Sequence, residues 1–336
     1  MSEHFGFPLE TLLIYVAVLT LSIVIDLHAY HKQTILTLRG AAAWSVFWVI
    51  MALAFYTYLW LRFDKKYADL FLVGFVLEES LSFDNLMVFM VIFSSFNISG
   101  LLLRRILFFG ILGAIGFRIL FASIGTALFA WSPWVGFVFA AIVAWTAWKM
   151  ITAGEGDTEL EDYSHHWSVR LTERFFPVFP RLHGTHLFID GVEAARQAGQ
   201  DNTIRYQGGL KKYATPAFLC LMAIQFTDVM FSFDSVPAVV AVTQEPLLVW
   251  GAMMFAVLGL RSLYYILEAL VKHLVYLGQA VIALLFYIAL KLAIGASNEI
   301  FHWPGIHIPP AVSLGIVAGI LGTGILASFL FPPKKS

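Results

Sequence analysis

One acidic phrase occurs twice in this chain, each time inside an apolar run. Residues 78–85 read Glu-Glu-Ser-Leu-Ser-Phe-Asp-Asn, and residues 228–235 read Asp-Val-Met-Phe-Ser-Phe-Asp-Ser. Each copy holds an acid, five intervening residues, an Asp and then an oxygen-bearing side chain. A charge at the centre of a membrane helix costs roughly 2.5–3.5 kcal/mol, so four acids cost on the order of 10–14 kcal/mol. This cost is comparable to the whole stability of a domain, about 5–15 kcal/mol. A chain would not keep so costly a feature without a use, and the usual use is a site for ions or protons.

Helical spacing decides which members of a copy lie together. On a continuous α-helix, residues four and seven apart share a face, so the first acid of each copy faces the same side as the Ser and the final polar residue. The Asp before that last residue, Asp84 or Asp234, points about a third of a turn away. All members converge only if the helix is locally broken. Pro237 supplies a reason in the second copy, because it leaves the carbonyl of Phe233 without its helical partner.

The two copies together offer carboxylates, an amide and hydroxyls, which form a hard, all-oxygen ligand set. Such a set suits Mg²⁺, Ca²⁺ or Mn²⁺. The thioethers of Met87 and Met230 favour Mn²⁺, although only weakly. The predicted metal-binding residues are Glu78, Asp84, Asn85, Asp228, Asp234 and Ser235, with auxiliary roles for Asp26, Ser82, Ser232, Arg118 and Arg261. An alternative stays open, in which the acids only form structural ion pairs with the two arginines.

Composition identifies the elements that must position these residues. Hydrophobic residues make up 60% of the 336 and charged residues 13%, against about 25% charged in globular domains, which indicates a polytopic membrane protein. Its single cysteine, Cys220, excludes a disulfide framework and a thiolate cluster. A net charge of −1 without a basic block excludes nucleic acid as a partner. Because a span needs roughly 20 apolar residues, we predict an all-α fold of about nine transmembrane helices near 11–27, 41–60, 70–96, 106–130, 134–151, 214–242, 247–267, 274–294 and 311–331.

Lysine and arginine placement predicts the orientation. Basic loops alternate with poorly basic ones along the chain, which puts the N-terminus outside and the C-terminus in the cytoplasm. One loop does not fit this pattern, because it holds Arg62, Lys65 and Lys66 but is predicted to lie outside. Residues 1–336 then form a single membrane domain, and residues 152–213 form a cytoplasmic loop that joins its two halves. The acidic stretch in that loop, 155–166, is expected to be a solvated surface.

Because successive spans cross the membrane in opposite directions, the predicted order of spans makes the two acidic copies antiparallel. The first lies on a span that runs inward and the second on a span that runs outward. This pattern is typical of an inverted-topology repeat, here with spans near 70–151 and 214–294, and such repeats hold their substrate near the bilayer midplane. Arg118 and Arg261 fit the scheme, since each follows a Leu-Gly pair, at 112–113 and 258–259, on the span after an acidic copy.

These motifs resemble the TerC/Alx family of bacterial integral membrane proteins over most of the chain. The residues that carry the resemblance include Ile25-Asp26, Glu78, Asp84-Asn85, Arg104-Arg105, Arg118, the phrase 213–216, Asp228, the phrase 234–238 and Arg261. The resemblance implies a cation transporter related to the LysE superfamily, with manganese efflux as its activity and tellurite resistance as its historical label. Gln225 departs from the pattern, because relatives often carry an acid there.

We therefore expect a secondary transporter that exports Mn²⁺, or a related hard divalent cation, across the bacterial inner membrane by proton exchange. There is no Walker motif for ATP-driven transport, and we expect neither enzymatic activity nor a cofactor. Its partners would be Mn²⁺, protons and the lipid bilayer, with a homo-oligomer left open. The alternative is a membrane factor that delivers Mn²⁺ to secreted or partner proteins. A third reading, an intramembrane hydrolase, lacks an activated nucleophile.

Overall fold

The computed structural model describes residues 3–4, 7–31, 37–153, 167–200, 212–270, 276–301 and 308–331, and within the helices it leaves some side chains out, among them those of Asp26, Asp84 and Asp234. The described parts are almost entirely helical, with four short strands. In chain order the elements are β1 (Glu3–His4), β2 (Phe7–Pro8), α1 (Leu9–His31), α2 (Leu38–Arg62), α3 (Lys65–Ser95), α4 (Gly100–Trp131), α5 (Trp134–Ala153), α6 (Trp167–Phe175), β3 (Phe188–Asp190), α7 (Gly191–Gln200), β4 (Lys212–Ala214), α8 (Pro216–Val242), α9 (Pro246–Leu270), α10 (Leu277–Phe301) and α11 (Pro310–Leu330).

Seven of the described helices are long and apolar enough to cross a membrane: α2, α4, α5, α8, α9, α10 and α11. Helix α3 has the length but carries too many charged residues, among them Glu78 and Glu79. In α1 the described side chains give an apolar stretch over Leu9–Val18, and some of the side chains that follow lie outside the described part. A multi-spanning helical membrane protein is thus confirmed, whereas nine spans and an inverted repeat stay predictions.

Local signals explain where the site helices begin. The Asp64 side chain accepts a hydrogen bond from the backbone N–H of Lys66 at 2.9 Å and caps the start of α3. Between α3 and α4 the chain turns within four residues, with Asn97 at φ 52° and Gly100 at φ 61°. Pro216 occupies the first turn of α8, where its missing N–H is not needed.

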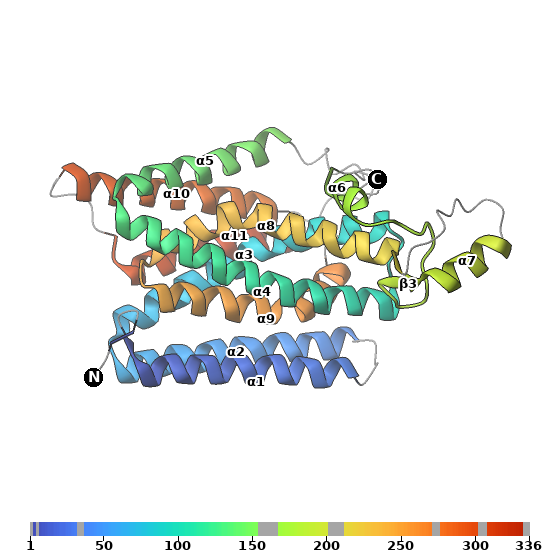
Figure 1. Cartoon of the computed structure of the whole chain (residues 1–336). Coiled ribbons are helices and arrows are strands. Elements are labelled where there is room, and N and C mark those ends of the chain that lie inside the picture. Colours follow the sequence, from blue (N-terminus) through green and yellow to red (C-terminus); the bar gives the residue numbers. More distant parts are fainter. Residues whose placement is uncertain are drawn as a thin grey trace.

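Helix packing brings the two acidic helices together around α9. The long helices lie side by side along a common direction (Figure 1). Helix α9 is almost wholly buried and packs against α2, α3 and α4, while α8 packs against α3 and α4, and α5 packs against α10. Both α3 and α8 are continuous, and Pro237 lies inside α8. The local break that would turn all members of a copy to one point is not seen in either helix.

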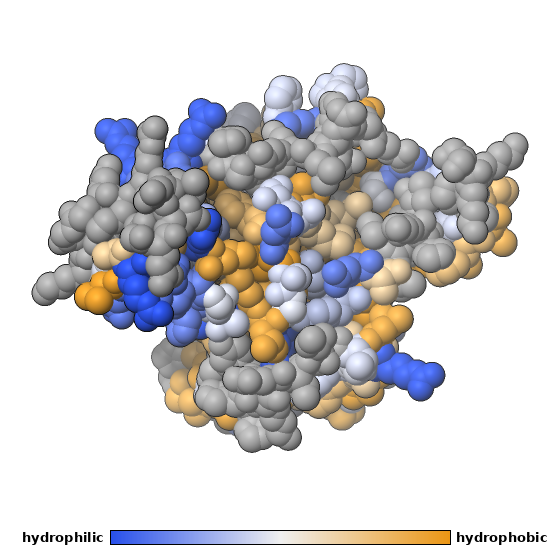
Figure 2. Space-filling model, turned by 90° about the vertical axis from the view of Figure 1, so that its right-hand side faces the viewer, coloured by the Kyte–Doolittle hydropathy of each residue, from blue (hydrophilic) through white to orange (hydrophobic). Residues whose placement is uncertain are grey.

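The segment between α5 and α8 forms a small unit at one end of the bundle (Figure 1). Its strands β3 and β4 pair antiparallel, and α6 packs on α8. Seen from that end, hydrophilic and hydrophobic residues are interspersed, with hydrophobic residues at the centre of the view as well as at its right-hand edge (Figure 2). The acidic stretch 155–166 of this segment lies outside the described residues.

Candidate functional site

A buried ion cluster joins one side chain from each of α3, α4 and α8. The guanidinium of Arg118 contacts the Glu78 carboxylate, and its Nη2 lies 3.3 Å from Oδ1 of Asp228. Arg118 and Glu78 have no exposed surface and Asp228 is 2% exposed. The first acid of each repeated phrase thus meets the other through one arginine, in a setting where water cannot solvate any of the three charges.

Hydroxyl and amide groups lie at helical spacing from the two acids on α3 and α8. Ser82, Asn85, Ser232 and Ser235 are all buried, as the helical spacing predicts. The Ser232 hydroxyl donates to the backbone carbonyl of Asp228 at 2.9 Å. Among the residues that the structure describes, the second carboxylate oxygens of Glu78 and Asp228 and the hydroxyls of Ser82 and Ser235 have no hydrogen-bond partner.

Buried polar atoms without partners are uncommon, and each leaves an unmet interaction. Four unmatched oxygens on two facing helices offer ligands to a hard cation. The described side chains do not, however, include three or more His, Cys, Asp or Glu residues gathered closely enough to hold a metal ion. The arrangement is two carboxylates bridged by Arg118, with Asp84 and Asp234 outside the described side chains.

The remaining predicted residues are placed as follows. Arg261 is buried, 5% exposed, on α9, the helix that packs most closely against α3. Asp26 lies on α1, and its side chain is outside the described part. The structure therefore brings Glu78, Arg118 and Asp228 into contact, with Asn85 and the three serines on the same two helices.

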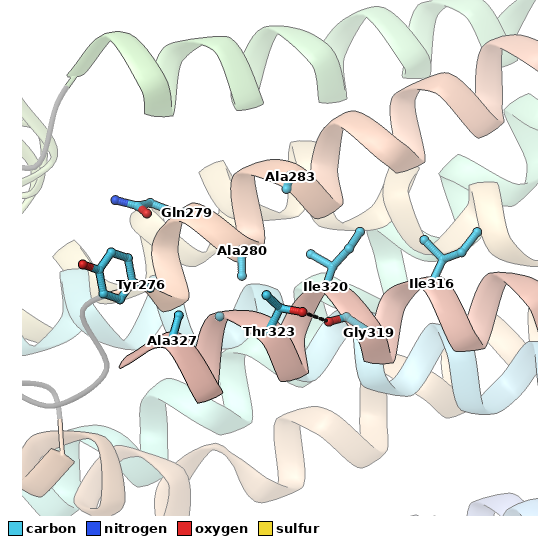
Figure 3. Close-up of a pocket in the computed structure, with 10 residues that line it drawn as sticks. Tyr276, Gln279, Ala280, Ala283, Ile316, Gly319, Ile320, Thr323 and Ala327 are labelled. Carbon is cyan, nitrogen blue, oxygen red and sulfur yellow. Dashed lines mark hydrogen bonds between the residues drawn. The ribbon is translucent and has the colours of Figure 1, made fainter. Parts of the chain in front are cut away.

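Among the residues that the structure describes, one cavity between the helices borders the site and another lies away from it. A cavity of about 500 Å³ is lined by residues of α3, α5, α8 and α10, including Asn85, Thr146, Lys149, Met150, Met230 and Phe231. A cavity of about 570 Å³ between α10 and α11 has no acidic or basic side chain in its lining, and Thr323 there bonds its own helix at the Gly319 carbonyl (Figure 3). The first cavity therefore borders both acidic helices, α3 and α8, and Asn85 is the predicted site residue in its described lining.

Sequence reasoning missed what the two Leu-Gly pairs do. Gln225 of α8 donates from Nε2 to the carbonyl of Gly110 at 2.9 Å, and its side chain occupies the space that a Cβ on Gly113 would need. A Cβ on Gly259 would lie 3.6 Å from a carboxylate oxygen of Glu79. Gly113 thus makes room for the Gln225 side chain, whereas a Cβ on Gly259 would be at an ordinary contact distance from Glu79. The pairs were visible in the sequence, but their partners were not.

Comparison with known proteins gives consistent matches over the whole chain. The family model described as "Integral membrane protein TerC family" matches residues 63–336. The chain is 47% identical to the "Tellurium resistance protein TerC" of Serratia marcescens, over 99% of this chain and 97% of that protein. It is 46% identical to the protein of the same name from an Alcaligenes species, with the same coverage.

A more distant relative has a different name. The "Putative membrane-bound redox modulator Alx" of Escherichia coli strain K12 is 34% identical, over 85% of this chain and 83% of that protein. No solved structure matches the chain. Sequence similarity, rather than likeness to a known fold, therefore establishes the relationship.

Proposed function

This chain belongs to the TerC family of integral membrane proteins, and we propose that it is a secondary transporter that exports Mn²⁺ from the cytoplasm in exchange for protons. The observation that carries the proposal is the buried Glu78–Arg118–Asp228 cluster, which joins the first acids of both repeated phrases. Acids inside membrane helices mark ion and proton pathways far more often than they serve structure alone.

The chemistry of the cluster favours a hard divalent cation. Every unmatched acceptor named above is an oxygen, and the single cysteine of the chain, Cys220, has an apolar setting. Oxygen-only sets favour Mn²⁺, Mg²⁺ and Ca²⁺ over Cu(I) or Zn²⁺. The thioethers of Met150 and Met230 line the neighbouring cavity and are soft groups beside the path, which is why we place Mn²⁺ first.

Arg118 gives the site a way to be stable without metal. Its guanidinium offsets one of the two negative charges of Glu78 and Asp228 in the absence of a cation. An arriving Mn²⁺ carries twice the charge of the guanidinium and prefers oxygen ligands, so it competes with Arg118 for the same oxygens. The arginine then yields its position, and it returns when the metal leaves.

The helix packing supports an inverted repeat. A two-fold axis that relates α3–α5 to α8–α10 pairs α3 with α8, α4 with α9 and α5 with α10. It exchanges the α3–α9 contact with the α8–α4 contact. It maps the α5–α10 contact and the α3–α8 contact onto themselves. All four contacts are present. Such an axis passes between the two acidic helices, which is where alternating access requires the substrate to bind.

Proton exchange follows from competition at the carboxylates. A carboxylate must be deprotonated to bind a metal ion, so metal and protons exclude each other from the same oxygens. With the N-terminus outside and the C-terminus in the cytoplasm, as the basic loops predict, an inward proton gradient would drive Mn²⁺ outward. The name tellurium resistance belongs to the relatives, and a site lined by carboxylates repels oxyanions.

Counterflow of radioactive Mn²⁺ in proteoliposomes tests the proposal. Purified protein should exchange external tracer for internal unlabelled Mn²⁺, because a transporter equilibrates the two pools. A factor that only hands Mn²⁺ to partner proteins would bind the tracer without accumulating it inside. Tracer uptake equal to that of protein-free liposomes would overturn the proposal.

A further inference from the structure

Two histidines face each other across a tight turn in the unit between α5 and α8. His183 and His186 form an antiparallel bridge around Gly184 and Thr185, and the backbone N–H of His186 donates to the carbonyl of His183 at 2.9 Å. Gly184 has φ 53°, a conformation that glycine adopts without strain. Because directly opposed residues of an antiparallel pair put their side chains on the same face, the turn presents both imidazoles together.

The separation of the imidazoles suits a shared metal ion. Their ring centroids lie 5.6 Å apart. A metal bound to two histidines at about 2.0–2.1 Å places the ring centroids roughly 5–6 Å apart for bond angles between tetrahedral and trigonal. His183 is half-buried and His186 is exposed, so an ion reaches them from solvent without any opening of the fold.

The carboxylate of Glu193 is separated from the histidine pair by the side chain of Gln197. Nε2 of Gln197 lies 3.2 Å from Nδ1 of His183 and 3.0 Å from Oε1 of Glu193. An amide NH₂ has two hydrogens, and here both neighbours act as acceptors. The amide nitrogen thus contacts a ring nitrogen and a carboxylate oxygen, and both are atoms that bind metal ions. It lies between them, where a cation bound to both would lie.

We infer that His183, His186 and Glu193 bind a divalent transition metal once the Gln197 side chain swings aside. In the present arrangement the three side chains are not gathered at one point, because Gln197 lies between the carboxylate and the imidazole. Glu193 and Gln197 are four residues apart on α7, so they share a helix face, and only side-chain rotation is required. Two imidazoles and one carboxylate favour Zn²⁺, Co²⁺ or Ni²⁺, unlike the all-oxygen set in the membrane.

The position of this second site links it to the transport helices. Nη1 of Arg105 donates to the backbone carbonyl of Thr185 at 2.7 Å, which ties the histidine turn to the first turns of α4. Helix α4 carries Arg118 of the buried cluster. The inference itself stands on the His183–His186–Glu193 geometry and does not require that the protein transports metal.

Binding of Co²⁺ to the full-length protein, purified without a polyhistidine tag, tests the inference. Co²⁺ titrated into the wild type should give visible absorption bands typical of nitrogen ligation, and Zn²⁺ should abolish them. His183→Asn, His186→Asn and Glu193→Gln should each weaken Co²⁺ binding about tenfold or more. Gln197→Ala should bind as tightly as the wild type or tighter, because the competing amide is gone.

Two controls make the result decisive. Glu173→Gln removes an exposed carboxylate of α6 and should leave the bands unchanged. The double variant Glu78→Gln/Asp228→Asn removes the membrane acids and should retain them, so failure of the transport proposal does not affect this outcome. Unchanged Co²⁺ affinity in His183→Asn and His186→Asn, or loss of the bands in the membrane double variant, would overturn the inference.

Discussion

The chemistry of the site depends on single atoms of Glu78 and Asp228. Replacing both carboxylates by amides, Glu78→Gln and Asp228→Asn, keeps their size but removes the charge that attracts a divalent cation. We expect counterflow of Mn²⁺ to fall to the level of protein-free liposomes; because the change leaves the buried Arg118 without these two counter-charges, counterflow is compared at equal amounts of folded protein. Glu79→Gln is the matched control, since Glu79 faces Gly259 rather than Arg118. Retained counterflow in the double variant would contradict the assignment.

Arg118 provides a second test at the scale of one residue. Removing one partner of a buried ion pair costs about 3–5 kcal/mol, because the other charges are left uncompensated. Arg118→Gln should therefore lower the melting temperature of the metal-free protein. Added Mn²⁺ should raise the melting temperature of the variant by more than it raises that of the wild type, since the metal no longer competes with the guanidinium. Thermal unfolding with and without Mn²⁺ measures both effects, and an equal Mn²⁺ shift in the two proteins would speak against displacement.

At the scale of elements, the approach of α4 to α8 depends on missing side chains. A Cβ on Gly125 would lie 2.8 Å from Cγ1 of Val236, and no non-hydrogen atom lies within 4 Å of a Cβ built on Gly116 of the same helix. Gly125→Ala should lower the melting temperature, because a β-branched side chain in a packed interface cannot easily give way. Gly116→Ala should be neutral or stabilising by about 0.5–1 kcal/mol. Equal melting temperatures for both variants would refute this account of the interface.

Helices were predictable here, while their contacts were not. Apolar windows predicted a helix at each position where a long one is described, because the bilayer sets the length that a span needs. Spacing also predicted that Glu78, Ser82 and Asn85 share a buried face. The predicted break near Pro237 is absent from α8, since neighbouring helices can compensate for the hydrogen bond that proline removes. Which acid meets Arg118 depends on tertiary packing, and periodicity carries no such information.

The direction and energy of transport belong to the whole molecule. If protons and Mn²⁺ compete for the same carboxylates, inside-out vesicles should take up more Mn²⁺ when their lumen is acidified, because protons leaving the lumen vacate the site for the metal at the other face. Uptake of radioactive Mn²⁺ under imposed pH gradients measures this, with vesicles of the Glu78→Gln/Asp228→Asn variant as the control. Uptake that ignores the pH gradient and follows only the membrane potential would rule out proton exchange.

The bridging arginine also has an electrical consequence. Without Arg118, the cluster of Glu78 and Asp228 would carry two negative charges when empty and none when it holds Mn²⁺, so the membrane voltage would act only on the return of the empty carrier. With Arg118 those charges become −1 and +1, before any proton is counted. Moving one charge across 100 mV involves about 2.3 kcal/mol. A permanent positive charge in the site therefore divides the electrical work equally between the two half-cycles, and neither becomes a voltage-imposed bottleneck.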